Sequence, residues 1–184
     1  MRKALLSYVL LGAGLLCTGT AIFIVVRAES HQSALVRQWT EPDFQPVADQ
    51  VIWPPGAVAI LHFGRQHRDV FVWGDEHPDH LAKGPVWLRQ TRGFAASGNT
   101  VIAGHRDTHF RFLKDARVGD RFDVVQDSLH LTFRIVMIRI VLPTDRALLA
   151  PTPKKTVTLV TCYPFYAIGR ADRRMIVRAE LVTE

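Results

Sequence analysis

Seven short runs of β-branched or alternating residues recur between turn signals through most of the chain. They cover residues 57–63, 69–73, 100–104, 121–125, 129–142, 157–161 and 174–182. Runs of this length predict β-strands, and their regular spacing favours an all-β sandwich or barrel. Helical patterns are short and lie at 77–82, 108–114 and 145–149. We therefore expect an all-β domain with short helices.

The longest of these runs, 129–142, changes character along its length. Its first half alternates, with Leu131, Phe133 and Ile135 separated by Thr132 and Arg134. Its second half has apolar residues on both faces, as is typical of strands that other structure covers. The pattern predicts a central strand that other structure covers.

A second constraint lies at the start of the chain. Residues 4–26 form 23 positions without a charge, which is long enough to cross a bilayer as a helix. Arg2 and Lys3 precede this run, so the positive-inside rule predicts a cytoplasmic N-terminus and a domain on the outer side of the membrane. The run is longer than the apolar region of a typical cleaved signal peptide, which favours an uncleaved anchor.

The chain thus divides into three predicted parts. Residues 1–27 form a transmembrane signal anchor, residues 28–53 a polar stalk or N-terminal arm, and residues 54–184 the β-domain. We expect the protein in the cell inner membrane as a single-pass protein, with its domain in the periplasm or another extracytoplasmic space.

The charge distribution argues against a nucleic-acid-binding protein. The 184 residues carry 23 basic and 17 acidic residues, a net charge of +6. Arg2, Lys3 and Arg27 flank the apolar run, and without them 20 basic and 17 acidic residues leave only +3. No basic cluster exceeds a pair, whereas nucleic-acid-binding domains concentrate their basic residues. A solvated surface of mixed charge explains the composition.

The two cysteines cannot form a structural disulfide in such a topology. Cys17 falls inside the predicted membrane span, and Cys162 falls inside the β-domain. A single thiol in an oxidising compartment is a liability unless it is buried or used chemically. Cys162 is therefore the first candidate for a functional residue.

The surroundings of Cys162 suggest nucleophilic chemistry. It ends the predicted strand that begins at Thr158, and Tyr163 and Pro164 follow directly. His105 likewise follows a predicted strand, 57 positions earlier. A thiolate is the reactive form of cysteine, a nearby histidine transfers protons, and a fixed arginine stabilises the oxyanion of an attacked carbonyl. Arg173 and Arg174 open the last strand and are candidates for that arginine.

These segments resemble sortases. The resemblance rests on TLVTC at 158–162, IAGHRD at 102–107, LKD followed by VGD within 113–120, and CYPF followed by IG and RMIV within 162–177. It extends over roughly residues 57–181, and the CYPF segment is most similar to class D sortases and their Gram-negative proteobacterial relatives. The order of these features along the chain also agrees with this family: the membrane anchor comes first, followed by the histidine, the cysteine and the arginine.

The resemblance implies a closed eight-stranded sortase-type β-barrel and a cysteine transpeptidase. Such an enzyme cleaves an LPxTG-like C-terminal sorting signal of an exported protein, forms a thioacyl enzyme and transfers the acyl group to an amine, here unidentified. By position, Cys162 is the nucleophile, His105 the general acid and base, and Arg174 the oxyanion or substrate ligand. Arg173 and the loop residue Arg170 are weaker candidates for that last role.

Further residues of the motifs are expected to bind substrate: Thr161, Ala103 and Gly104. No cofactor is implied. The pairs His77 with His80 and His105 with His109 lack the remaining ligands of a zinc site, and no acidic loop supports a calcium site. Two alternatives stay open, namely hydrolysis of the intermediate by water and a non-catalytic periplasmic barrel that binds peptides.

Overall fold

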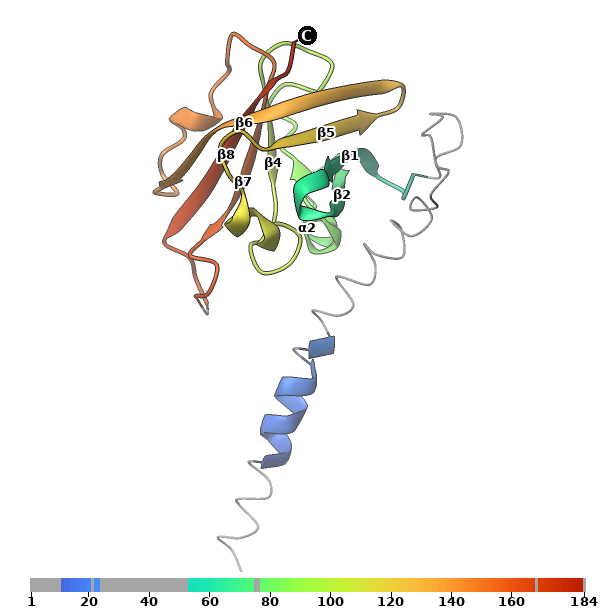
Figure 1. The fold of residues 1–184 in the computed structure, drawn as a ribbon. Helices are drawn as coiled ribbons and strands as arrows, with labels where there is room; N and C mark the ends of the chain where they lie inside the picture. The colour runs from blue at the N-terminus through green and yellow to red at the C-terminus, as the bar shows by residue number, and fades with distance from the viewer. Residues whose placement is uncertain (1–10, 21, 24–52, 75–76, 168, 184) are drawn as a thin grey trace, which may run out of the picture.

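The computed structural model describes residues 11–20, 22–23, 53–74, 77–167 and 169–183. In this part, the strands close into a barrel in the order β1-β2-β3-β4-β7-β8-β6-β5 (Figure 1). The strands are β1 (Ala57–Phe63), β2 (Arg68–Trp73), β3 (Val86–Trp87), β4 (Asn99–Ala103), β5 (Arg121–Gln126), β6 (Leu129–Val141), β7 (Thr156–Tyr163) and β8 (Arg173–Leu181). The closed eight-stranded barrel expected from the resemblance is confirmed.

The helices of the barrel are short. They are the α-helix α2 (Pro78–Lys83) and the 3₁₀ helices η2 (Gly64–Gln66), η3 (Arg111–Asp115) and η4 (Ala147–Leu149). All seven predicted runs become strands, and α2, η3 and η4 lie where helical patterns were seen. Strand β3 was missed because two residues are too few to show alternation.

The prediction for the longest run was only partly right. β6 spans Leu129–Val141, and Phe133 and Ile135 are buried as expected. A bulge follows between Ile135 and Met137, and beyond it Ile140 is 38% exposed. The prediction that both faces are covered was therefore wrong, since the bulge interrupts the alternation and the second half of β6 pairs with β8 but extends beyond its pairing with β5.

At the N-terminus, residues 11–20 and 22–23 are helical. No helix of the described residues is both long and apolar enough to cross a membrane. The predicted span at 4–26 lies partly, and the predicted arm at 28–53 almost entirely, outside the described residues.

Two of the strand pairs are parallel and the others antiparallel. β2 pairs with β3, and β4 with β7, in the parallel sense. A parallel pair needs a long crossover, because a tight turn can join only antiparallel strands. The crossover from β4 to β7 contains η3, β5, β6 and η4, and it brings segments more than fifty positions apart side by side (Figure 1).

Aromatic side chains inside the barrel hold β1, β5 and β6 together. The rings of Phe63 and Phe122 stack with centroids 4.7 Å apart, and Phe122 stacks on Phe133 at 5.8 Å. All three residues are at most 2% exposed. Burying a phenylalanine side chain contributes about 1.5–3 kcal/mol, so this column fixes the half of the barrel that faces away from Cys162.

The half-buried carboxylate of Asp120 joins η2, which follows β1, to the loop before β5. Asp120 accepts hydrogen bonds from Arg65 Nη2 at 2.7 Å, from the Arg117 backbone N–H at 2.8 Å and from Gln66 Nε2 at 3.3 Å. Burial raises the pKa of Asp120, but these donors and the charge of Arg65 outweigh burial, so the pKa lies below its usual value. The ionised carboxylate therefore stabilises the folded state.

Asp120→Asn should lower the free energy of unfolding by about 1–2 kcal/mol at pH 7, because charge-assisted hydrogen bonds are lost. A lowered folded pKa gives stability that is present above the unfolded pKa, about 3.9, and is lost as the pH falls through the folded pKa. Urea denaturation at several pH values should show the two proteins converging on acidification. Asp127→Asn is a matched control, since Asp127 is exposed and its φ of 48° suits asparagine. A difference in the free energy of unfolding between the wild type and Asp120→Asn that stays constant with pH would contradict this account.

Candidate active site

The predicted site residues lie at the ends of three neighbouring strands. In the parallel pair of β4 and β7, Ala103 is the partner of Val160. The Gly104 backbone N–H donates to the Val160 carbonyl at 3.0 Å, so the pairing continues past the end of β4. If the same register is extended by two positions beyond Ala103 and Val160, His105 corresponds to Cys162. In the antiparallel pair of β7 and β8, Cys162 is the direct partner of Arg174.

All three residues belong to the outer face of the barrel. Leu159 on β7 and Met175 and Val177 on β8 point into the core. Because successive side chains of a strand alternate between faces, Cys162 and Arg174 point outward. Ile102 on β4 also belongs to the core, and the same alternation carried past the strand end places His105 on the outer face.

The site is open to solvent. Cys162 is a free, half-buried thiol, Arg174 is half-buried and His105 is exposed. A peptide on the outer face would therefore meet a nucleophile, a proton-transfer group and a cation without any rearrangement of the core. The three residues that sequence analysis selected from distant motifs are brought together by the backbone register.

The guanidinium of Arg174 lies against the chain that precedes β8. Its Nη1 donates to the Arg173 carbonyl at 2.9 Å and to the Ala171 carbonyl at 3.4 Å. Its other two nitrogens, Nη2 and Nε, make no hydrogen bond to the described residues, which leaves them available to a substrate. Arg173, by alternation, points to the other side of β8 and is exposed.

Thr161 and Gly104 connect β7 to the segment that carries His105. Thr161 is 2% exposed, and its hydroxyl donates to the Gly104 carbonyl at 2.8 Å. A Cβ at Gly104 would lie 2.7 Å from a ring carbon of buried Phe110, so only glycine fits beside this ring. Both residues hold the histidine segment in place, and the substrate-binding role expected for Thr161, Gly104 and Ala103 stays a prediction.

The loop between β6 and β7, residues 142–155, is fastened to β4 by Asn99. The Asn99 amide donates from Nδ2 to the Ala150 carbonyl at 3.1 Å and accepts at Oδ1 from the Thr158 hydroxyl at 2.7 Å. Asn99 and Thr158 are at most 1% exposed. This buried pair fixes the β6–β7 loop at the start of β4, the end of the strand opposite to His105.

The loop between β7 and β8, residues 164–172, is fastened by Arg106. Its guanidinium donates to the carbonyls of Pro164, Ala167 and Gly169 at 2.7–3.0 Å. The sequence motifs assign no role to Arg106 or Asn99. The position of Arg106 directly after His105 could have indicated a role near the site, but nothing in the sequence shows which loop a buried side chain will contact.

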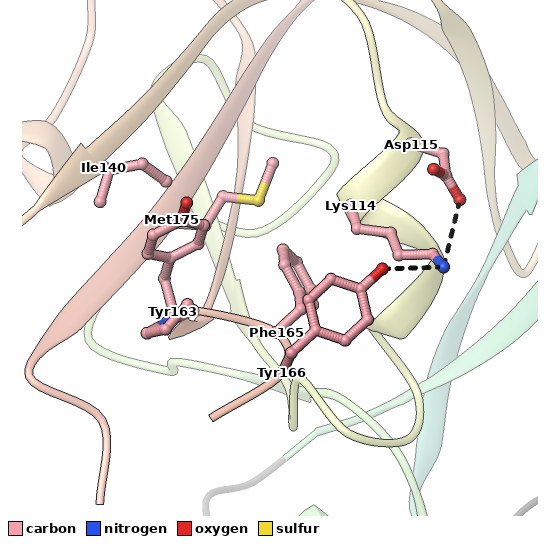
Figure 2. Close-up of a pocket in the computed structure, with 8 residues that line it drawn as sticks. Lys114, Asp115, Ile140, Tyr163, Phe165, Tyr166 and Met175 are labelled. Atoms are coloured by element: carbon pink, nitrogen blue, oxygen red, sulfur yellow. Dashed lines mark hydrogen bonds and ion pairs between the residues drawn. The ribbon is translucent and has the colours of Figure 1, made fainter. Parts of the chain in front are cut away.

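One cavity is lined in part by residues that follow Cys162 in the chain (Figure 2). It measures about 290 Å³ and is lined by Lys114, Asp115, Ile140, Tyr163, Pro164, Phe165, Tyr166 and Met175. Lys114 Nζ donates to the Tyr166 hydroxyl at 3.4 Å and lies 4.0 Å from Asp115 Oδ2. Met175 belongs to the inner face, and none of Cys162, His105 and Arg174 lines this cavity.

His77, His80 and His109, the other members of the histidine pairs noted in the sequence, have structural contacts. His77 caps α2 by accepting from the Asp79 backbone N–H at 3.3 Å, and the ring of His80 packs against Trp73. His109 is 8% exposed, and its Nε2 lies 3.3 Å from the Ala82 carbonyl. Among the residues that the structure describes, no group of three or more His, Cys, Asp or Glu side chains is arranged to hold a metal ion.

Comparison with known proteins gives matches to one family. A model of the sortase domain matches residues 61–182. The chain is 32% identical over 128 residues to Sortase D of Bacillus subtilis (strain 168), covering 69% of this chain and 65% of that protein. It is 30% identical over 102 residues to Sortase SrtE1 of Streptomyces coelicolor, covering 49% of this chain and 28% of that protein. The chain thus spans less than two thirds of the length of either curated relative.

Solved structures show the same fold. Sortase A from Corynebacterium diphtheriae superposes with a TM-score of 0.65 at 23% identity, covering 88% of this chain and 83% of that one. The Clostridium perfringens sortase D5 transpeptidase superposes with a TM-score of 0.64 at 20% identity, covering 84% and 99%.

Proposed function

Because this chain belongs to the sortase family, we propose that it is a membrane-anchored cysteine transpeptidase. Its substrate is an exported protein with an LPxTG-like C-terminal sorting signal, and its product is that protein joined to an amine. One observation supports the proposal, namely the strand register, which pairs Cys162 with Arg174 and sets the end of β4, directly before Gly104 and His105, beside β7.

In the first half-reaction, the Cys162 thiolate attacks the carbonyl carbon of the threonine in the signal. Negative charge develops on the carbonyl oxygen, where the guanidinium of Arg174 stabilises it. The C–N bond to the following residue breaks, and the departing amine takes a proton from His105. The products are a thioester at Cys162 and the released C-terminal fragment.

In the second half-reaction, the acceptor amine attacks the thioester carbonyl. His105, now neutral, accepts a proton from this amine, and the C–S bond breaks to regenerate the thiolate. Water can take the place of the amine, in which case the product is a free carboxylate. The exposure of His105 is compatible with either nucleophile.

The anchor part of the proposal rests on the charge-free run at 4–26 and the basic residues before it. A helix of that composition holds the barrel at the outer surface of the inner membrane, with the N-terminus in the cytoplasm. Exported proteins that are themselves tethered to this membrane by a C-terminal segment would then meet the site without diffusing far.

Intact-protein mass spectrometry of the full chain in detergent, incubated with LPxTG-like peptides, should show a thioacyl adduct on the wild type. Addition of hydroxylamine should convert the adduct to a peptide hydroxamate. Cys162→Ala should give neither species, because the nucleophile is absent. Hydroxamate formation by Cys162→Ala would contradict the assignment, and peptide binding without any adduct on the wild type would favour the non-catalytic barrel.

Arg174→Ala should lower kcat/KM with a peptide substrate by about 10²-fold or more, as the loss of an oxyanion donor does in other enzymes. Arg173→Ala is the matched control, since Arg173 is adjacent but faces the other side of β8. Its kcat/KM should change less than about threefold. The reverse ranking would assign the oxyanion role to Arg173.

In intact cells with a permeabilised outer membrane, added protease should degrade the barrel, and the protein should stay with the membrane after a high-salt wash. A surface-bound protein held by charge would dissociate under that wash, because salt screens such contacts. Recovery of the barrel in the wash would contradict the proposed topology, as would its protection from protease in cells with a permeabilised outer membrane but not after lysis.

A further inference from the structure

Arg106 is a buried cation directly beside the proposed catalytic histidine. The residue is 4% exposed, although its neighbours His105 and Asp107 are both exposed. A buried charge is costly unless hydrogen bonds compensate it. Its only carboxylate contact among the described residues is weak, with Nε 3.3 Å from Asp107 Oδ1, and Asp107 is 61% exposed. The compensation for burial must come mainly from elsewhere.

That compensation comes from backbone carbonyls of the β7–β8 loop. Nη1 donates to Pro164 at 3.0 Å, and Nη2 donates to Ala167 at 2.7 Å and to Gly169 at 2.8 Å. Three carbonyls spread over six positions thus converge on one guanidinium, so the loop is curved around it. Charge-assisted hydrogen bonds of this length are among the stronger ones in proteins.

The same loop ends at the proposed oxyanion ligand. Beyond Gly169, the carbonyl of Ala171 accepts from Arg174 Nη1, as does that of Arg173. Arg106 therefore holds the first part of the loop, and Arg174 lies against its last part. A change in the curvature of the loop moves the carbonyls against which the Arg174 guanidinium rests.

We propose that Arg106 is a positioning residue of the active site, which holds the β7–β8 loop in the shape that places the Arg174 guanidinium beside Cys162. Arg106 itself does not contact the substrate, since its donors are directed to the loop. The inference rests on the proposed function for its effect on turnover, but the effect on the loop is independent of any activity.

Lysine cannot replace arginine in this role. Its ammonium keeps the positive charge but is a compact group without the planar fork that reaches separated acceptors. Arg106→Lys therefore preserves charge and most of the buried volume while losing part of the carbonyl contacts. The loop keeps other contacts on its far side, where Phe165 packs on Tyr163 and Tyr166 meets Lys114, so the variant is expected to fold (Figure 2).

The first measurement is hydrogen–deuterium exchange of the full chain in detergent. Arg106→Lys should exchange faster over residues 164–172 than the wild type, with the rest of the barrel unchanged. Arg111→Lys is the matched control, because Arg111 is an exposed arginine on η3 and should leave exchange in the loop unchanged. Unaltered exchange in Arg106→Lys would overturn the proposal, whether or not the protein proves to be a transpeptidase.

The second measurement is a double-mutant cycle on turnover of a sorting-signal peptide. Arg106→Lys should lower kcat by about 10- to 100-fold with little change in KM, as misplacement of a catalytic group does. In the Arg174→Ala background, the same substitution should have almost no further effect, because the group that it positions is absent. If Arg106→Lys lowered kcat in the Arg174→Ala background as much as it does in the wild type, Arg106 would act through another residue. That result would overturn the proposal.

Gly169→Ala perturbs the same contact from the loop side. Gly169 has φ +85°, a conformation that alanine adopts only with strain, and a Cβ there would meet no atom within 4 Å. The substitution thus acts on the backbone alone and leaves Arg106 intact. It should also accelerate exchange over 164–172 and lower kcat non-additively with Arg174→Ala. This variant decides the question if Arg106→Lys does not fold, and an unchanged loop and kcat would contradict the proposal.

Discussion

The parallel pairing of β4 with β7 is the constraint on which the rest of the site depends. His105 and Cys162 are separated by a crossover that contains two strands of the barrel, so no local turn can bring them together. The pairing of Ala103 with Val160, extended by the Gly104 amide, sets how far each strand reaches. A slip of one residue in this register would move Cys162 and His105 to different faces, since side chains alternate.

Two buried polar residues, Asn99 and Arg106, fix the positions of the two loops that flank β7. Asn99 at the start of β4 holds the β6–β7 loop through Ala150, and Arg106 beyond the end of β4 holds the β7–β8 loop through three carbonyls. Both residues are buried, and their side chains donate hydrogen bonds to backbone carbonyls of these loops. One short strand and its extension therefore position the histidine and both loops, while β7 supplies the nucleophile.

The packing of the barrel determines how the core and the candidate site are distributed over its strands. The stacked rings of Phe63, Phe122 and Phe133 stabilise the β1, β5 and β6 side, where no predicted site residue lies. The opposite side carries half-buried polar residues on its outer face, which contribute less to burial. The strands β7 and β8 nevertheless serve both the core and the candidate site, since Leu159 and Val177 face the core while Cys162 and Arg174 face outward.

The sequence by itself determined the strands, the short helices and the identities of the candidate site residues. Alternation and turn residues are local properties, and Cys162, His105 and Arg174 each stand in a recognisable local motif. Only the tertiary structure decided the strand order, the bulge that exposes Ile140 and the contacts of Arg106 and Asn99. These features depend on which distant segments meet, and no local pattern encodes a hydrogen bond between residues some sixty positions apart, such as that from Arg106 to Ala167.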